Sequence, residues 1–111
     1  MRIYFKTNKL QKICSQAQEM VKKLGHKNAS KLKQRMMELG AADTLADISH
    51  LPPMRCHELT GKDAGTFSVD LEHPYRLLFI SADDPVPLLA NGGIDKQQVK
   101  EIEIIEIKDT H

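Results

Sequence analysis

The spacing of apolar residues along the chain changes from helical to alternating at a pair of prolines, Pro52 and Pro53. Ahead of them, the short apolar segment Arg2–Phe5 predicts an edge strand, and Thr7 or Asn8 is a suitable N-cap for a helix that follows directly. The apolar residues of this helix recur every three or four positions and therefore form one stripe: Leu10, Ile13, Cys14, Ala17, Met20, Val21 and Leu24.

Two glycines predict the ends of a helical hairpin. Gly25 can adopt the left-handed conformation that ends the first helix, and Gly40 ends the second. Asn28 is a suitable cap for the second helix, and Thr44–Ile48 predicts one more helical turn before the prolines. The second helix has an apolar side of its own, which consists of Leu32, Met36 and Leu39.

The part of the chain after the prolines predicts a sheet. The segment Thr60–Gly65 is typical of a hairpin loop, and His73 with Pro74 predicts a second tight turn, so the first three strands form a meander. The alternation of apolar and polar residues predicts four strands, at Met54–Leu59, Thr66–Leu71, Tyr75–Ile80 and Val99–Ile107.

The last predicted strand has apolar residues on both faces. Ile102 and Ile104 share one face and Ile105 and Ile107 the other, so either a β-bulge lies near Ile104 or the strand is buried on both sides. The loop before it, Ala82–Gln98, is expected to be mobile or shaped by a partner. The pattern predicts an α+β fold, in which an N-terminal strand and a helical hairpin pack on a mainly antiparallel sheet of four to five strands.

Length and composition limit the architecture further. A chain of 111 residues with 41% apolar and 28% charged residues predicts one domain that spans residues 1–111. It has neither a signal-peptide pattern nor an apolar stretch long enough to span a membrane, so the expected location is the cytoplasm. Cys14 and Cys56 are predicted to be buried thiols. No CxxC or HxxxH spacing occurs, so we expect neither a metal nor a cofactor.

The net charge of +1 conceals an uneven distribution of charge. The segment from Arg2 to Arg35 has ten Lys or Arg residues and a single acidic residue, Glu19, whereas the remainder has six basic and fourteen acidic residues. The first third therefore presents a cationic surface. Such a surface could follow a phosphate backbone, receive an acidic partner segment, or simply be a solvated helical face, and composition does not separate these three.

Three short motifs in the second half are similar to those of one known family. Residues 57–61 read H-x-L-x-G, Pro74–Phe79 reads P-Y-R-L-x-F, and residues 108–111 read K-D-x-H. Together with the segment Gly65–Asp70 and the order of strand, helical hairpin and meander, these motifs resemble the HigB-like "killer protein" group of the RelE/ParE superfamily. The resemblance covers most of the chain, strongly from Pro52 onward and weakly over the helices.

The resemblance implies the toxin of a type II toxin–antitoxin system. Such a toxin is a ribosome-dependent endoribonuclease that cuts messenger RNA without a metal and is held inactive by a helix-turn-helix, HigA-like antitoxin. A metal-free ribonuclease uses the 2′-hydroxyl of RNA as nucleophile, so it needs a base, an acid and cations around the phosphate, and it does not cut DNA. Operator DNA would be bound only through the antitoxin, because this chain has no recognition-helix pattern.

The resemblance also implies which residues perform the chemistry. The two histidines at the matched positions would share the work of acid and base, in an order that the sequence leaves open, and the aspartate could orient an imidazole or take part in proton transfer. The arginine would bind the phosphate, although it could instead pair with Asp70 or Glu72 across the turn. The four matched positions are His57, Arg76, Asp109 and His111.

Three further residues are weaker candidates for RNA binding. Arg55 and Lys62 are cations placed by position alone, and Tyr75 could stack on a base or pack within its strand. Two departures from the family pattern bear on activity. Thr110 stands where related toxins often have a tyrosine, and the hairpin loop has Lys62 before Asp63, whereas relatives tend to have the acidic residue first.

Two other functions fit the same motifs. The first is a ParE-like inhibitor that binds DNA gyrase and performs no chemistry, because one scaffold can support both functions. The second is a catalytically inactive member of the family that is retained for repression together with its antitoxin. An inhibitor would not need His57, Asp109 and His111, so these residues distinguish it from the nuclease.

Overall fold

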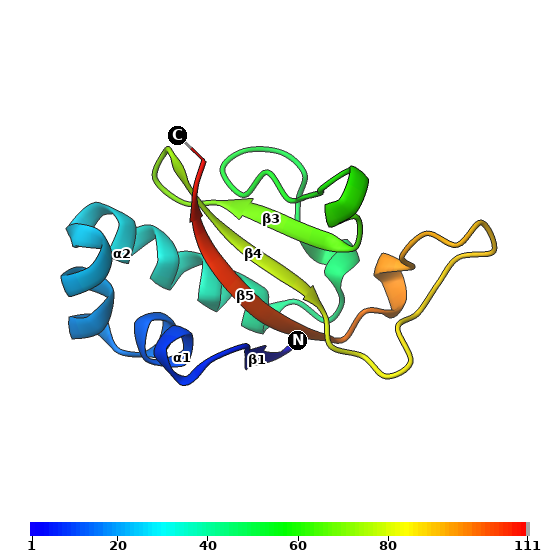
Figure 1. The fold of residues 1–111 in the computed structure, drawn as a ribbon, viewed down its shortest axis with the longest axis horizontal. Coiled ribbons are helices and arrows are strands. Elements are labelled where there is room, and N and C mark those ends of the chain that lie inside the picture. Colours follow the sequence, from blue (N-terminus) through cyan, green and yellow to red (C-terminus); the bar gives the residue numbers. More distant parts are fainter. Residues whose placement is uncertain (111) are drawn as a thin grey trace.

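The computed structural model describes residues 1–110, which form two α-helices and a five-stranded mixed sheet (Figure 1). In chain order, the elements are β1 (Arg2–Phe5), α1 (Asn8–Ser15), α2 (Ala17–Ala41), β2 (His57–Glu58), β3 (Thr66–Asp70), β4 (Tyr75–Ser81) and β5 (Glu101–Asp109). Three short 3₁₀ turns lie at Leu45–Asp47, Gly61–Asp63 and Lys96–Gln98. The strand order is β1-β5-β4-β3-β2, in which β1 is parallel to β5 and the other neighbours are antiparallel.

The helical hairpin is present, but the first predicted helix is divided. It is interrupted at Gln16, whose backbone is extended (φ −118°, ψ 118°), so α1 ends there and Ala17 is exposed rather than part of the buried stripe. Gly25 (φ 80°, ψ 169°) then bends α2 into two arms at the predicted position. Thr7 caps α1 as predicted, since its Oγ1 accepts a hydrogen bond from the backbone N–H of Leu10 at 3.1 Å. No helix within residues 1–110 is both long and apolar enough to cross a membrane.

Asn28 does not cap the second helix as predicted. Because Gly25 already turns the chain, the second arm of α2 begins before Asn28, and this residue is buried inside it. Its Oδ1 accepts a hydrogen bond from the backbone N–H of Glu72 at 2.8 Å. The side chain therefore joins the helix to the turn between β3 and β4.

The hydrophobic core lies between the helices and one face of the sheet. Figure 1 shows α2 running across this face, while the opposite face carries no helix. Fully buried side chains come from α2 and from the three central strands, and the set includes Leu32, Leu39, Phe67, Val69, Leu77, Phe79, Ile102 and Ile104. The rings of Phe67 and Phe79 stack with centroids 5.9 Å apart. We call the face away from the helices the open face.

Of the two alternatives for the last strand, the β-bulge near Ile104 is the one present. Leu78 pairs with Glu106 and Phe79 pairs with Ile104, so Ile105 is the extra residue in β5. Because the bulge reverses the alternation, Ile104 before it and Ile107 after it both pack against the core. One irregular residue thus accounts for the isoleucines that seemed to point to both faces.

One predicted strand is shorter than expected, and the long loop contains local structure. The first strand after the prolines is limited to His57–Glu58, because Arg55 has a left-handed backbone (φ 47°) that a regular strand does not accept. The segment Ala82–Gln98 extends away from the sheet (Figure 1) and contains a bridge between Leu88 and Ile94. A hydrogen bond of 2.7 Å from the N–H of Leu89 to the carbonyl of Gly93 closes its turn.

Candidate functional site

Side chains of four strands form two rows across the open face. Residues paired across neighbouring strands share a face, and so do residues two positions apart in one strand. The register therefore places seven side chains together on this face. The first row contains His57, Ser68, Leu78 and Glu106, and the second contains Asp70, Arg76 and Lys108.

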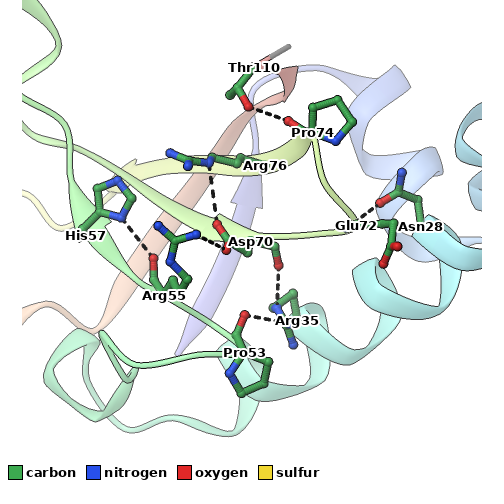
Figure 2. Close-up of polar contacts among 10 residues, drawn as sticks. All are labelled: Asn28, Arg35, Pro53, Arg55, His57, Asp70, Glu72, Pro74, Arg76 and Thr110. Carbon is green, nitrogen blue, oxygen red and sulfur yellow. Dashed lines mark hydrogen bonds and ion pairs between the residues drawn. The ribbon is translucent and has the colours of Figure 1, made fainter.

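A carboxylate in the second row holds two arginines. Asp70 Oδ2 lies 3.1 Å from Nη1 of Arg55, and Oδ1 lies 3.6 Å from Nε of Arg76 (Figure 2). The alternative pairing of Arg76 with Asp70, which the sequence left open, is thus present. A guanidinium has five N–H donors, so each arginine is positioned by the carboxylate and retains donors for a phosphate. Arg55, Asp70 and Arg76 also line a hollow of about 80 Å³.

The hydrogen bond of His57 determines which of its nitrogens is available. Nδ1 lies 3.1 Å from the backbone carbonyl oxygen of Arg55 (Figure 2). A carbonyl oxygen can only accept, so this hydrogen bond requires the proton on Nδ1. In the neutral imidazole, Nε2 is then the unprotonated nitrogen. The arrangement is that of a general base next to two guanidinium groups.

Arg55 adopts its position at a cost in backbone energy. Its φ of 47° lies in the left-handed region, which costs a non-glycine residue about 1–3 kcal/mol. Backbone hydrogen bonds on both sides stabilise this conformation: the N–H of Cys56 donates to Ser49 at 2.9 Å, and the N–H of Asp70 donates to Met54 at 2.8 Å. The strained residue therefore lies within the candidate site.

Three residues that the sequence analysis did not select belong to the site or support it. Lys108 neighbours Arg76 in the sheet and makes no ion pair with any residue of 1–110. Ser68 lies opposite His57, is completely buried, and its Oγ has no hydrogen-bond partner within the described chain. Lys108 begins the K-D-x-H motif and Ser68 lies in the segment Gly65–Asp70, but only the pairing register places them beside Arg76 and His57.

Arg35 is the third of these residues and joins α2 to the site. It is 2% exposed, and its Nε donates to the backbone carbonyl of Asp70 at 2.7 Å. Its other nitrogens donate to Glu38 Oε1 at 2.8 Å and to the carbonyl of Pro53 at 3.2 Å (Figure 2). Arg35 thus fixes the main chain at Asp70 and just before Arg55. In the sequence it resembles the exposed cations around it.

The remaining predicted residues lie outside the two rows. Tyr75 pairs with Asp109 on the other face of the sheet, where Tyr75 packs against the core, and it also lines the hollow next to Asp70 and Arg76. Lys62 lies in the exposed 3₁₀ turn at the opposite end of the β2–β3 hairpin from Asp70. His111 lies outside the described residues. Thr110 is anchored to Pro74, since its N–H and its Oγ1 both donate to that carbonyl, at 3.0 and 2.6 Å.

A second and larger hollow lies beside the helices. Its volume is about 560 Å³, and it is located between α1, the first arm of α2 and the end of β5. Lysines and apolar side chains line it together, so we call it the lysine-rimmed groove. Its lining includes three lysines and one carboxylate, Lys6, Lys9, Lys23 and Glu106, together with Leu10, Ile13, Leu24, Tyr75, Ile105 and Ile107.

Both cysteines are buried thiols, as predicted. Burial raises the pKa of Cys14 to about 12. It also raises the pKa of Cys56 to about 11, where the positive charge of Lys96 opposes the effect. Within residues 1–110, no three His, Cys, Asp or Glu side chains are grouped in a way that could hold a metal ion.

Comparisons with known proteins identify the fold. No protein-family model matches the sequence, and no curated protein matches it. Among solved structures, the YoeB/ParE toxin from Agrobacterium tumefaciens superposes with a TM-score of 0.61, and the match covers 100% of both chains. The chain has the RelE/ParE-like toxin fold. At 11% sequence identity this likeness shows the fold alone, so function has to be argued from the open face.

Proposed function

We propose that this chain is the toxin of a toxin–antitoxin pair and that it cuts messenger RNA on the ribosome, as the HigB-like resemblance implies. The observation that carries the proposal is the placement of His57 next to Arg55 and Arg76 on the open face, with Nδ1 bonded and Nε2 available. A protein that only bound gyrase would need neither a histidine in this state nor cations around it.

The open face supports the following reaction. His57 Nε2 takes the proton of the ribose 2′-hydroxyl, and the 2′-oxygen attacks phosphorus. The bond from phosphorus to the 5′-oxygen breaks, which leaves a 2′,3′-cyclic phosphate and a 5′-hydroxyl end after an acid protonates the leaving oxygen. Arg55, Arg76 and Lys108 supply positive charge for the phosphorane-like transition state. With His57 as the base, the acid in this proposal comes from the C-terminal motif, to which Asp109 and His111 belong; the resemblance itself leaves the order of acid and base open.

The ribosome supplies part of the binding in this proposal. The open-face rows and the neighbouring Arg55 contain three cations and two carboxylates, Asp70 and Glu106, so the excess of positive charge is small. Affinity for free RNA depends strongly on the number of phosphates that a protein neutralises. A site with so little excess charge is better suited to RNA that the ribosome already holds.

The deciding experiment maps the 5′ ends of messenger RNA in an active translation extract. Wild-type protein should produce new cuts with 5′-hydroxyl ends, only when ribosomes are present. His57→Ala should abolish them, whereas His26→Ala, which changes an exposed histidine of α2, should not. Toxicity in cells without any cuts would indicate a protein-binding inhibitor, for example of gyrase. The absence of both would indicate an inactive member.

We further propose that the antitoxin contacts the lysine-rimmed groove. Its apolar lining and its three lysines are suited to an acidic, amphipathic segment of the partner. Reversing two charges with Lys9→Glu and Lys23→Glu should weaken the complex with a helix-turn-helix antitoxin, as measured by titration calorimetry. Lys62→Glu is the matched control on the opposite side of the fold. An unchanged affinity for the double variant would exclude the groove.

A further inference from the structure

We propose that Arg55 acts on His57 through its main chain. The left-handed backbone at Arg55 directs the carbonyl of this residue towards Nδ1 of His57 and thereby favours the neutral tautomer in which Nδ1, and not Nε2, carries the proton. Arg55 is in this sense a positioning residue, in addition to the cation that its side chain supplies. The role of Nε2 as a base rests on the proposed function, whereas the tautomer of the neutral ring does not.

The direction of this carbonyl is unusual for a strand. In a regular strand the carbonyls lie in the plane of the sheet and the side chains stand perpendicular to it. If Arg55 continued β2 as a regular strand, its carbonyl would therefore lie in the plane of the sheet and away from the imidazole ring. The left-handed φ at Arg55 rotates the peptide group, and its oxygen is found 3.1 Å from Nδ1.

The surrounding contacts hold Arg55 in this conformation. Its N–H donates to the carbonyl of Leu51 at 3.0 Å, and the next N–H, that of Cys56, donates to Ser49 at 2.9 Å. Its guanidinium is tied to Asp70, and Arg35 fixes the main chain at Asp70 and Pro53. The carbonyl therefore has little freedom to leave the imidazole.

The hydrogen bond from Nδ1 to the carbonyl of Arg55 suits a general base both before and after His57 takes up a proton. Before the reaction, the carbonyl selects the tautomer in which Nδ1 carries the proton and Nε2 is free to accept one. After Nε2 has taken a proton, Nδ1 still donates to the same oxygen, and a bond from a charged donor is stronger than one from a neutral donor. A ring without this bond would distribute its proton between both nitrogens, and part of the population would be unable to act.

The test separates the backbone of Arg55 from its side chain. Arg55→Asn removes the guanidinium but tolerates the left-handed conformation, whereas Arg55→Val removes the guanidinium and disfavours that conformation because valine is β-branched. Nitrogen-15 NMR of histidine-labelled protein, at a pH where the imidazoles are neutral, reports the tautomer directly. The His57 signals are assigned by their loss in His57→Gln.

We expect wild type and Arg55→Asn to show His57 protonated at Nδ1, and Arg55→Val to show a mixture. In the ribosome-dependent cleavage assay, Arg55→Val should then be slower than Arg55→Asn by on the order of tenfold, although both lack the cation. A wild-type ring protonated at Nε2 would overturn the proposal. So would a mixture in Arg55→Asn, because the side chain would then be what orients the ring.

The tautomer of His57 in wild type and in Arg55→Asn decides the proposal without depending on nuclease activity or on the folding of Arg55→Val. Wild type and Arg55→Asn suffice even where Arg55→Val does not fold, since a change of tautomer in Arg55→Asn already contradicts the proposal. If wild type proves to have no nuclease activity, the proposed function fails, but the NMR result still decides whether the main chain of Arg55 sets the tautomer of His57.

Discussion

The two faces of the sheet have different roles: one packs against the helices, and the other carries the charged side chains of the candidate site. On β4, Leu77 and Phe79 are completely buried on the helical side. Arg76, one residue before Leu77, lies on the open face. On β3, Val69 belongs to the core and Asp70 to the site. Because successive side chains alternate, a step of one residue changes a packing role into a chemical one. At the ends of β3 and β4 next to their turn, packing and chemistry are therefore assigned to alternating positions, whereas Ser68 and Leu78 further along the open face are buried.

The strongest test of this separation is a residue that connects the helical side to the site. Arg35 lies in α2 with the core, but its hydrogen bonds end on the main chain of Asp70 and Pro53 and on Glu38. Arg35→Ala would leave three acceptors without their donor, two of them backbone carbonyls. We expect the free energy of unfolding to fall by roughly 3–5 kcal/mol, measured by urea denaturation.

The matched control for Arg35 is Lys33→Ala. Lys33 is an exposed cation in the same arm of α2, so its removal should change the free energy of unfolding by no more than about 0.5 kcal/mol. A loss below about 1 kcal/mol for Arg35→Ala would show that water replaces its hydrogen bonds. The helix would then not be what holds Asp70 in place.

A large part of the covered face could be predicted from the sequence, because apolar periodicity depends only on which side chains must leave water. Together with the glycines and the His73-Pro74 turn, this periodicity predicted the hairpin at Gly25, the meander and, as one of two alternatives, the bulge close to Ile104. The break at Gln16 was not predictable in this way. The stripe of residues 10–24 keeps its helical spacing across Gln16, and periodicity carries no information about one extended backbone residue.

The open face was predictable only in part, because it depends on register and on backbone conformation. Motif resemblance selected His57 and Arg76, which the fold does bring to one face. Tyr75 was selected with them, but it follows the alternation onto the core face. Lys108 belongs to the K-D-x-H motif, but only the alignment of β4 with β5 places it next to Arg76. Nothing in the sequence distinguishes Arg35 from the lysines around it, since its burial is a property of the packed helix.

Arg76 and Leu77 are adjacent in β4, and their substitution should have opposite effects on activity and stability. Arg76→Ala should lower the rate of ribosome-dependent cleavage by roughly 10²–10³-fold, the usual effect of removing one transition-state donor. Its partly exposed ion pair with Asp70, at 3.6 Å, contributes no more than about 1 kcal/mol to stability. Leu77→Ala should do the reverse: it should cost about 2–5 kcal/mol in the free energy of unfolding and leave the activity per folded molecule unchanged.

Arg76→Lys distinguishes the role of charge from that of geometry at this position. A lysine keeps the charge but not the forked guanidinium, so most of the activity should still be lost. If Arg76→Lys were fully active, a point charge would suffice at this place. If Arg76→Ala lowered the free energy of unfolding as much as Leu77→Ala does, the assignment of stability to one face and activity to the other would be wrong.

The smallest expected effect comes from the buried thiols and appears only at alkaline pH. Burial raises the pKa of Cys14 to about 12 and that of Cys56 to about 11, from an ordinary value of 9.0, so the folded state favours the protonated thiols. This stabilisation is complete below pH 9 and is lost as the pH rises towards the folded-state pKa values. Between pH 8 and pH 10, the free energy of unfolding should fall by about 1 kcal/mol for each thiol.

The variant with both Cys14→Ala and Cys56→Ala isolates this contribution, because lysine and tyrosine titrations are common to both proteins. Denaturation of the two proteins at pH 8, 9 and 10 should show the steeper decline in wild type. Equal slopes would mean that water reaches the thiolates in the folded state. Cys56 immediately precedes His57, so this result would also show whether the chain really passes from core to site within a single residue.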